Sequence, residues 1–342
     1  ALRTPIGRFR GGLSRVRADD MAAHVLSGLL GRQKEAKDCL DEVILGATNQ
    51  AGEDNRNIAR MAALLAGLPH EVTGVTVNRL CGSGLEAIID AARAIAVGDH
   101  EVVVAGGVES MSRAPYAMAK PEEAFPRTPP KVYDTSLGWR FVNPKMPEDY
   151  TIGMGVTAEN VAERYNVSRA DQDAFALSSH LKAAAAWDAG VFEREVIGVD
   201  VPPASKRAEA TRFERDESIR ADSSIEALSR LRPVFREGGS VTAGNSSPLN
   251  DGAAMVLLAS RAWAEKHGVT PRARFVSSGS AGVHPNVMGI GPIPATQKAL
   301  ARAGLKASDI DVVELNEAFA AQSLACVRTL EFDPEKVNIH GG

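Results

Sequence analysis

The sequence of 342 residues has few cysteines and no long hydrophobic run. Its three cysteines, Cys39, Cys81 and Cys326, are scattered and form no C-x-x-C pair, which argues against a disulfide framework and against a zinc knuckle. No apolar run reaches the roughly 18 residues that a membrane-spanning helix needs. The net charge is only −4, so we expect no global attraction to nucleic acid or to an anionic membrane.

These absences favour a globular protein in a reducing compartment. The beginning of the sequence has no charged-then-apolar signal peptide, and sparse, scattered cysteine is typical of the cytoplasm. Hydrophobic residues make up 44% and charged residues 24% of the chain, as in ordinary soluble proteins. We therefore expect a cytoplasmic protein that binds neither nucleic acid nor membrane.

Strand-like and helix-like segments alternate at both ends of the sequence, which predicts an α/β fold with a mostly parallel sheet. The N-terminal segments are strands in Asp41–Gln50, Val72–Val77 and Glu101–Gly107 and helices at Asp54–Leu68 and Ser83–Gly98. The C-terminal segments are strands at Gly252–Ser260, Ala273–Gly282 and Asp311–Leu315 and helices at Arg261–Gly268, Pro294–Leu305 and Asn316–Leu330.

The middle of the chain lacks this alternation. Residues 111–239 are rich in proline, arginine and acidic residues and include two helical segments, Thr157–Val167 and Ser168–Gly190. Aromatic residues within this range can anchor it, so we interpret it as an insertion over the sheet and not as a linker. The predicted domains are residues 1–110, an inserted loop domain at 111–239, and a C-terminal half at 240–342.

Two polar residues occupy junctions between a predicted strand and a predicted helix. Cys81 lies in "VNRLCGSGLEAI", and Asn316 begins "NEAFAAQ". A thiolate at a helix N-terminus is stabilised by unpaired N–H groups and by the helix dipole, so Cys81 is either an aimed nucleophile or a small residue in a tight turn. Asn316 is either a ligand-binding residue or a plain helix cap.

Taken together, these loops resemble the thiolase family over essentially the whole chain. The matching segments are "RTPIGRFRGGLS", "VNRLCGSGLEAI", "GGVESMSRAPY", "TAENVAERY", "LRPVF", "TAGNSSPLNDGAA", "MGIGPIPAT" and "ELNEAFAAQ". The resemblance implies the thiolase fold, with two duplicated α/β halves that contain five-stranded mixed sheets and an inserted loop domain. It also implies a homodimer or homotetramer.

The resemblance further implies acyl transfer between a 3-oxoacyl-CoA and CoA by a ping-pong route through an acyl-Cys81 intermediate. In the family, the Asn of N-E-A-F, here Asn316, holds a water at one oxyanion site. The backbone N–H of the nucleophile serves another. Coenzyme A and acyl-CoA are substrates, and neither a permanently bound cofactor nor a metal is expected.

Five other residues match binding positions of the family. Ser247 corresponds to a contact with the pantetheine of CoA and Arg220 to a contact near the adenine. Met154, Met288 and Phe319 correspond to residues that line the acyl and pantetheine tunnel. Each has an ordinary structural alternative, since Met288 and Phe319 also suit a hydrophobic core and Arg220 also suits a solvated surface.

Two features qualify the resemblance. The sequence starts without Met and ends at Gly342 within an N-x-x-G-G motif, before the motifs that carry the family's catalytic histidine and second cysteine, so we expect both ends to be incomplete. His340 precedes the Gly-Gly pair and is not assigned the catalytic role. If the chain truly ended at Gly342, a non-catalytic CoA-binding protein would be the alternative.

The segment Tyr133–Met146 hints at the substrate. It resembles the corresponding loop of β-ketoadipyl-CoA thiolases, which act on a dicarboxylic acyl group, and Arg140 could pair with a distal carboxylate. A short-chain 3-oxoacyl-CoA is the competing substrate. A ketoacyl synthase on the same fold is a third class, against which "NEAFAAQ" and "GGVESMS" argue.

Overall fold

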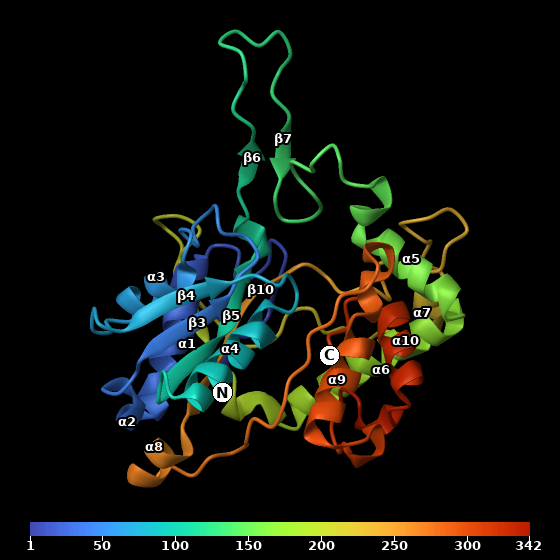
Figure 1. Ribbon diagram of the computed structural model, residues 1–342. Coiled ribbons are helices and arrows are strands. Elements are labelled where there is room, and N and C mark those ends of the chain that lie inside the picture. The colour runs from blue at the N-terminus through green and yellow to red at the C-terminus, as the bar shows by residue number, and fades with distance from the viewer. The chain divides into compact units, whose positions relative to one another are not determined.

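The computed structural model describes residues 1–342, which form two compact units of three segments each (Figure 1). Unit 1 comprises Ala1–Leu137, Glu193–Ser218 and Leu249–Phe275. Unit 2 comprises Gly138–Phe192, Ile219–Pro248 and Val276–Gly342. No helix in either unit has the length and apolar character needed to cross a membrane.

Unit 1 is built around a mixed sheet with the strand order β1-β10-β5-β3-β4, and β2 also pairs with β10. Strand β3 is parallel to both β4 and β5, whereas β10 is antiparallel to β5, β1 and β2. The strands are β1 (Leu2–Arg3), β2 (Gly7–Arg8), β3 (Glu42–Gly46), β4 (Thr73–Val77), β5 (Val102–Ser110) and β10 (Asn250–Ala259).

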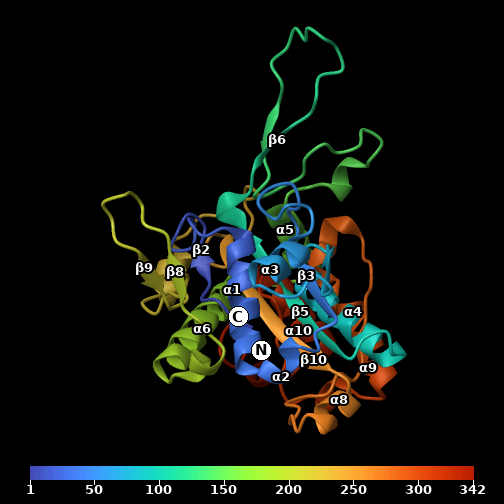
Figure 2. The ribbon, with the colours of Figure 1, turned by 90° about the vertical axis from the view of Figure 1, so that its left-hand side faces the viewer.

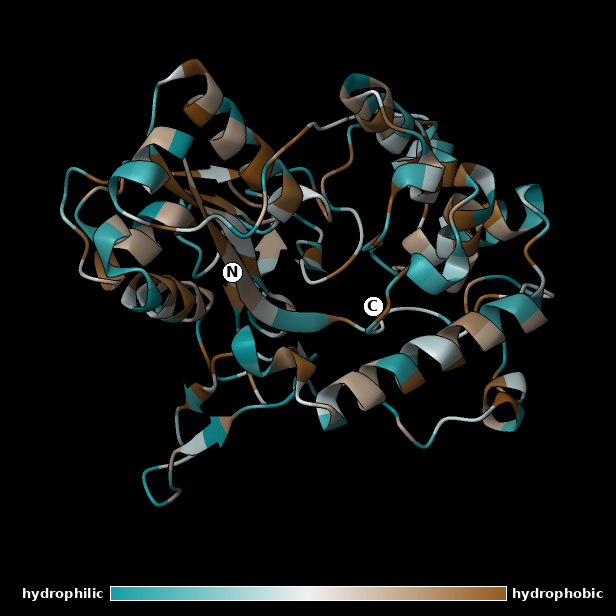
Figure 3. Ribbon diagram, turned by 90° about the horizontal axis from the view of Figure 1, so that it is seen from below, coloured by the Kyte–Doolittle hydropathy of each residue, from teal (hydrophilic) through white to brown (hydrophobic).

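Helices cover both faces of this sheet, which explains why its central strands are almost wholly apolar. Helices α1 (Ala18–Arg32) and α3 (Ile58–Leu65) pack with Val43 and Leu45 on one face. Helix α4 (Ser83–Val97) packs with Ile44 on the other. Figures 1 and 2 show α4 and α1 on opposite sides of the sheet, and Figure 3 shows brown, hydrophobic strands between helices of mixed colour.

The remaining elements of unit 1 are short. Two hairpins extend from it, and in Figure 1 the long loop between β6 and β7 projects well away from the sheet. These elements are α2 (Lys34–Lys37), η1 (Met111–Arg113), β6 (Tyr116–Met118), β7 (Val132–Asp134), β8 (Val199–Val201), β9 (Thr211–Phe213) and α8 (Arg261–Lys266).

Unit 2 consists of helices and loops around its own small core, in which α5 and α10 pack with each other and with η4. Its α-helices are α5 (Met154–Arg164), α6 (Arg169–Asp188), α7 (Ile225–Ser229), α9 (Pro292–Ala303) and α10 (Ala320–Leu330). Its short 3-10 helices are η2 (Glu148–Tyr150), η4 (Pro285–Ile290), η5 (Ala307–Asp309) and η6 (Pro334–Lys336), and η3 (Val191–Arg194) crosses into unit 1.

The structure corrects the expected strands in unit 2. Neither Ala273–Gly282 nor Asp311–Leu315 forms a strand; Val313 makes only an isolated parallel bridge with Val337. Apolar residues alone do not make a strand, because a strand also needs a neighbouring segment that accepts and donates its backbone hydrogen bonds.

The start of the last long helix is also corrected. Helix α10 begins at Ala320 with Phe319 as its N-cap, so Asn316 is not the cap residue. Hydrogen bonds to other loops hold the segment before the helix, as described below. Of the two alternatives that the sequence left open for Asn316, the plain helix cap is therefore wrong.

The units do not coincide with the three ranges drawn from the sequence. Residues 111–239 contribute segments to both units. Strand β10, assigned to the C-terminal half, completes the sheet of unit 1 by pairing with β5 from Asp251–Ser110 to Ala259–Val102. This antiparallel pairing joins strands far apart in sequence, which composition does not reveal.

Candidate active site

Cys81 lies on an exposed turn between β4 and α4 in unit 1. Helix α4 starts two residues later, with Gly82 as its N-cap, so Cys81 stands beside the N-terminus of a long helix as predicted. The preceding residue, Leu80, has a φ of 49°, a left-handed conformation that is unusual for a branched side chain. Strained backbone of this kind is found at sites that present a reactive group.

Ser83 holds this turn together. Its buried side chain accepts a hydrogen bond from Arg79 N at 2.8 Å and donates one to Leu80 O at 2.6 Å. The backbone amides of Gly82 and Ser83 donate to Arg79 O and Leu80 O. These hydrogen bonds hold the residues on both sides of Cys81.

A second set of contacts ties the turn to the sheet. Asn78 accepts a hydrogen bond from Leu80 N and donates one to Thr48 O. Thr48 in turn donates from its amide and its hydroxyl to Glu109 at 2.7 and 2.6 Å. Burial raises the pKa of Glu109, while the hydrogen bonds from Thr48 oppose the shift.

A glycine lets the helix start approach the sheet. A Cβ at Gly46, the last residue of β3, would lie 2.3 Å from the backbone carbon of Ser83. Any larger residue at this position would therefore push the Cys81 turn outward.

Asn316 is exposed in unit 2, and its side-chain amide makes no hydrogen bond. The segment around it is held by Asn338, a buried residue with a φ of 45°. The Asn338 amide accepts from Leu315 N at 2.7 Å and donates to Leu315 O at 2.8 Å and to Glu317 at 2.6 Å. Sequence reasoning missed Asn338, although it is the Asn of the N-x-x-G-G motif.

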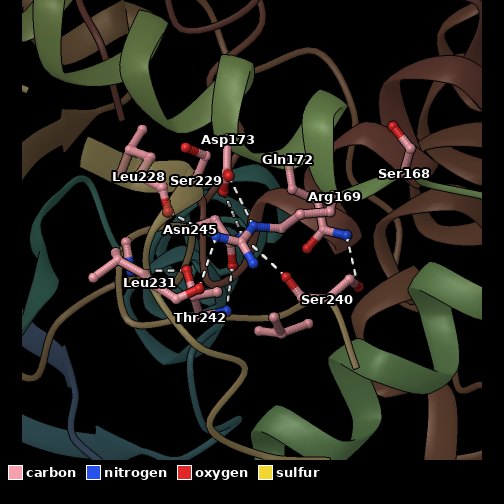
Figure 4. Close-up of polar contacts among 12 residues, drawn as sticks. Ser168, Arg169, Gln172, Asp173, Leu228, Ser229, Leu231, Ser240, Thr242 and Asn245 are labelled. Atoms are coloured by element: carbon pink, nitrogen blue, oxygen red, sulfur yellow. Dashed lines mark hydrogen bonds and ion pairs between the residues drawn. The ribbon is translucent and has the colours of Figure 1, made fainter. Parts of the chain in front are cut away.

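Ser247 is exposed and lies next to the Asn316 segment within unit 2. Its amide donates to Ala318 O at 3.0 Å, and its hydroxyl donates to Pro248 O. The loop that carries it is tied to α5, where Val241 N donates to Glu159. It is also tied to α6 by the contact of Asn245 with Asp173, which Figure 4 shows.

Arg220 is exposed, and its backbone amide donates to Nδ1 of His180 on α6 at 3.3 Å. Burial lowers the pKa of His180, and the positive charge of Arg220 lowers it further. The neutral imidazole is thereby favoured next to a free guanidinium, an arrangement that suits an anionic ligand.

Met154, Met288 and Phe319 lie on neighbouring parts of unit 2. Met154 begins α5, Met288 lies in η4, and Phe319 caps α10; these three elements pack against one another. Phe235 stacks edge-on with Phe319 at a centroid distance of 6.1 Å. This partly exposed ring is a further candidate lining residue, and the quoted "LRPVF" segment could have drawn attention to it.

The other two cysteines lie in settings that differ from that of Cys81. Cys326 is buried in the core of unit 2, where burial raises the pKa of its thiol to about 11. Cys39 is exposed in a charged stretch. Cys81 alone combines exposure with a constrained turn at a helix start.

The predicted site residues thus fall in both units. Cys81 lies in unit 1, and the other six predicted residues lie in unit 2, where the Ser247 loop is bonded directly to the segment after Asn316. No group of three or more His, Cys, Asp or Glu side chains is placed to hold a metal ion.

Comparison with known proteins identifies the family of the chain. Residues 1–262 match the thiolase N-terminal domain, and residues 269–342 match the thiolase C-terminal domain. The chain belongs to the thiolase family. Thiolases are acyltransferases that act on acyl-CoA substrates, so the fold and the reaction class expected from the sequence are confirmed.

Individual relatives cover the whole chain. A β-ketoadipyl-CoA thiolase of Pseudomonas aeruginosa is 57% identical over 346 residues, covering 100% of this chain and 85% of the relative. A 3-oxoadipyl-CoA/3-oxo-5,6-dehydrosuberyl-CoA thiolase of Escherichia coli is 52% identical over 345 residues, with the same coverage. The crystal structure of a Bacillus anthracis acetyl-CoA acetyltransferase superposes with a TM-score of 0.90 at 43% identity, covering 100% of this chain and 84% of that one.

Proposed function

We propose that this thiolase cleaves 3-oxoadipyl-CoA with CoA, through a covalent acyl group on Cys81. The observation that carries the proposal is the exposed Cys81 on a locked turn at the start of α4, in a chain 57% identical to a β-ketoadipyl-CoA thiolase. The relatives give no support to the alternative of a CoA-binding protein without turnover.

The chemistry follows from the carbon skeleton of the substrate. The Cys81 thiolate attacks the C3 carbonyl carbon, and the C2–C3 bond then breaks with its electron pair moving to C2. The products are a succinyl thioester on Cys81 and the enolate of acetyl-CoA, which takes a proton at C2. The thiolate of a second CoA attacks the thioester, leaves as succinyl-CoA and restores Cys81.

Two oxygens become negatively charged during this reaction, the one at C3 and the enolate oxygen of acetyl-CoA, and each needs a hydrogen-bond donor. The Gly82 and Ser83 amides are used within the turn, so we assign the Cys81 amide to the oxyanion at C3. The unbonded side-chain amide of Asn316 is suited to hold a water near the enolate oxygen. Ser247 and Arg220 would hold the pantetheine and the nucleotide end of CoA, and Met154, Met288 and Phe319 would line the passage between.

Acylation can be tested by mass spectrometry. Incubation of the full-length protein with acetyl-CoA should add one acetyl group, and peptide mapping should place it on Cys81. Cys81→Ser should take up no label and should lower kcat by at least about a thousandfold, as loss of a nucleophile does. Cys39→Ser is the matched control and should acylate like the wild type. A label on Cys39 or Cys326 would refute the assignment.

Arg140 is the residue that we propose to bind the distal carboxylate. It is half-buried and forms no ion pair. Its neighbour Trp139 donates from Nε1 to Ile152 O at 3.4 Å, which anchors this segment close to Met154 at the start of α5. A half-buried guanidinium without a carboxylate partner suits a dicarboxylic substrate.

The substrate assignment predicts a selective defect. Arg140→Gln should lower kcat/KM for 3-oxoadipyl-CoA by about 10- to 100-fold, the value of a charged hydrogen bond. The same variant should leave kcat/KM for acetoacetyl-CoA unchanged, because that substrate has no distal carboxylate. Arg127→Gln, an exposed arginine in the β6–β7 loop, is the control. Equal losses on both substrates, or better wild-type turnover of acetoacetyl-CoA, would contradict the proposal.

We also infer that the protein forms a homodimer or homotetramer. Strand β4 is an edge strand with one side unpaired, and unpaired edges are templates for pairing with another chain. Exposed apolar side chains surround it on β4, the Cys81 turn and the adjacent helices: Leu64, Leu65, Val75, Leu80 and Leu85. Exposed apolar side chains beside an open edge suit a second copy of the chain.

A further inference from the structure

We propose that Asn245 is a positioning residue that holds the Ser247 loop and the Asn316 segment in one fixed register. This inference rests on the proposed roles of Ser247 and Asn316 in binding and catalysis. Asn245 itself touches no substrate in this proposal. It acts through two neighbouring segments of unit 2, and the ion pair of Arg169 with the buried Asp173 sets its orientation (Figure 4).

The backbone around Asn245 pairs with the residues that follow Asn316. Asn245 O accepts from Ala320 N at 3.0 Å, and Ser247 N donates to Ala318 O at 3.0 Å. Between them, Ser246 and Phe319 form an isolated antiparallel bridge. A shift of Asn245 therefore moves the Ser247 loop and the end of the N-E-A-F segment together.

The side chain of Asn245 is buried, and its amide is fully hydrogen-bonded. Its Oδ1 accepts from Thr242 N at 2.8 Å. Its Nδ2 donates to Asp173 Oδ1 at 3.0 Å and to Ser240 O at 3.2 Å. These contacts close the 240–245 loop on itself and bind it to α6.

The contact to Asp173 requires a donor at position 245. Asp173 is buried, and its other oxygen accepts from Arg169 Nε at 2.7 Å. Arg169 also donates to Leu228 O at 2.7 Å and to Leu231 O at 3.0 Å. These contacts fix the Arg169 guanidinium, which in turn fixes the orientation of Asp173. A carboxylate at position 245 would face the Asp173 carboxylate with no donor between them.

The orientation of Asn245 affects the proposed roles of both Ser247 and Asn316. Ser247 is the contact for the pantetheine of CoA, and Asn316 is the support for the enolate oxygen. Loosening Asn245 should therefore weaken CoA binding and slow the chemical steps in the same molecule. A residue with a purely structural role would instead lower the amount of folded enzyme and leave KM unchanged.

The test compares Asn245→Asp with the exchanged pair Asp173→Asn/Asn245→Asp. The single variant places two carboxylates against each other and should raise KM for CoA about tenfold and lower kcat by about 100-fold, the cost of roughly 1 Å of misplacement. The double variant restores a donor–acceptor pair with its direction reversed, so it should recover at least about tenfold of the lost kcat/KM. Asn166→Asp, an exposed asparagine of unit 2, is the control for the change of residue type.

The outcomes separate this inference from the proposed function. If the wild type acylates Cys81 and turns over but Asn245→Asp has the wild-type KM for CoA, the positioning role is refuted. Failure of the double variant to recover any activity would also refute it. If the wild type neither acylates nor turns over, the proposed function itself fails. Should Asn245→Asp not fold, Asp173→Asn keeps the packing and should give a smaller change of the same sign in both KM and kcat.

Discussion

Among the proposed site residues, the reactive side chains are exposed and the side chains that hold them are buried. Cys81 and Asn316 are open to solvent, whereas Ser83, Asn338 and Asn245 are almost fully buried. The exposed group was predicted from the sequence, because residue type and a neighbouring helix already indicate its chemistry. Of the buried group, Asn338 and Asn245 were not predicted, because their partners lie far along the chain.

Distances along the chain show why. Asn338 binds Leu315, which is 23 residues away, and Asn245 binds Asp173, which is 72 residues away. Neither an asparagine nor its immediate neighbours indicate which distant carbonyl or carboxylate it will meet. Only the tertiary structure brings the donor and the acceptor together.

The buried Glu109 side chain predicts how the stability of the protein depends on pH. Burial raises its pKa in the folded protein, so the folded state binds more protons than the unfolded state between the unfolded and folded pKa values. Stability contributed by this group is present below its unfolded pKa of about 4.3 and is lost as the pH rises through the folded pKa. Glu109→Gln removes this loss and keeps an oxygen that can accept from Thr48.

The measurement is the melting temperature of the wild type and the variant between pH 4.5 and 8. The difference, variant minus wild type, should increase with pH and then level off once Glu109 is ionised in the folded protein. Glu265→Gln, on the exposed side of α8, is the matched control and should show a flat difference. A flat or falling difference for Glu109→Gln would contradict the argument.

At the scale of whole elements, helices were predicted better than strands. Helix α4 has the predicted bounds and ends at Gly98, whose φ of 85° suits a glycine cap. Helix signals are local, since periodicity and caps lie within the segment itself. The strands expected in unit 2 needed partners that local sequence does not identify, and the start of α10 was decided by contacts with Asn245 and Asn338.

The start of α4 is the element that most directly affects catalysis. Ser83→Ala removes both side-chain bonds across the Cys81 turn and should lower the free energy of unfolding by about 1 kcal/mol. The turn should then sample other conformations, so acylation of Cys81 by acetyl-CoA should slow by about tenfold or more.

Chemical denaturation and rapid-quench mass spectrometry would measure these two effects. Ser229→Ala removes one exposed hydroxyl contact at the end of α7 and should change neither quantity. An unchanged acylation rate in a destabilised Ser83→Ala variant would mean that the turn is held by its backbone bonds alone.

At the scale of the whole molecule, each unit is assembled from three separate segments. Composition changes along the chain suggested three consecutive ranges, but chain order and spatial grouping differ because β10 returns to the sheet of the N-terminal part. Family resemblance supplied the thiolase fold, which residue patterns alone limited only to an α/β class. The proposed self-association of the chain is the feature on which residue patterns alone say least.

The open edge of β4 supplies the test of that property. Val75 is an exposed residue in the middle of β4, and a lysine there places a charge that must lose its water if a second chain pairs with the edge. Val75→Lys should therefore shift the protein from an oligomer toward a folded monomer in sedimentation velocity at micromolar concentration. Val97→Lys changes a still more exposed valine, at the last position of α4, and should leave the oligomer intact. If the wild type is already a monomer, or if both variants dissociate alike, the β4 edge is not the contact between copies.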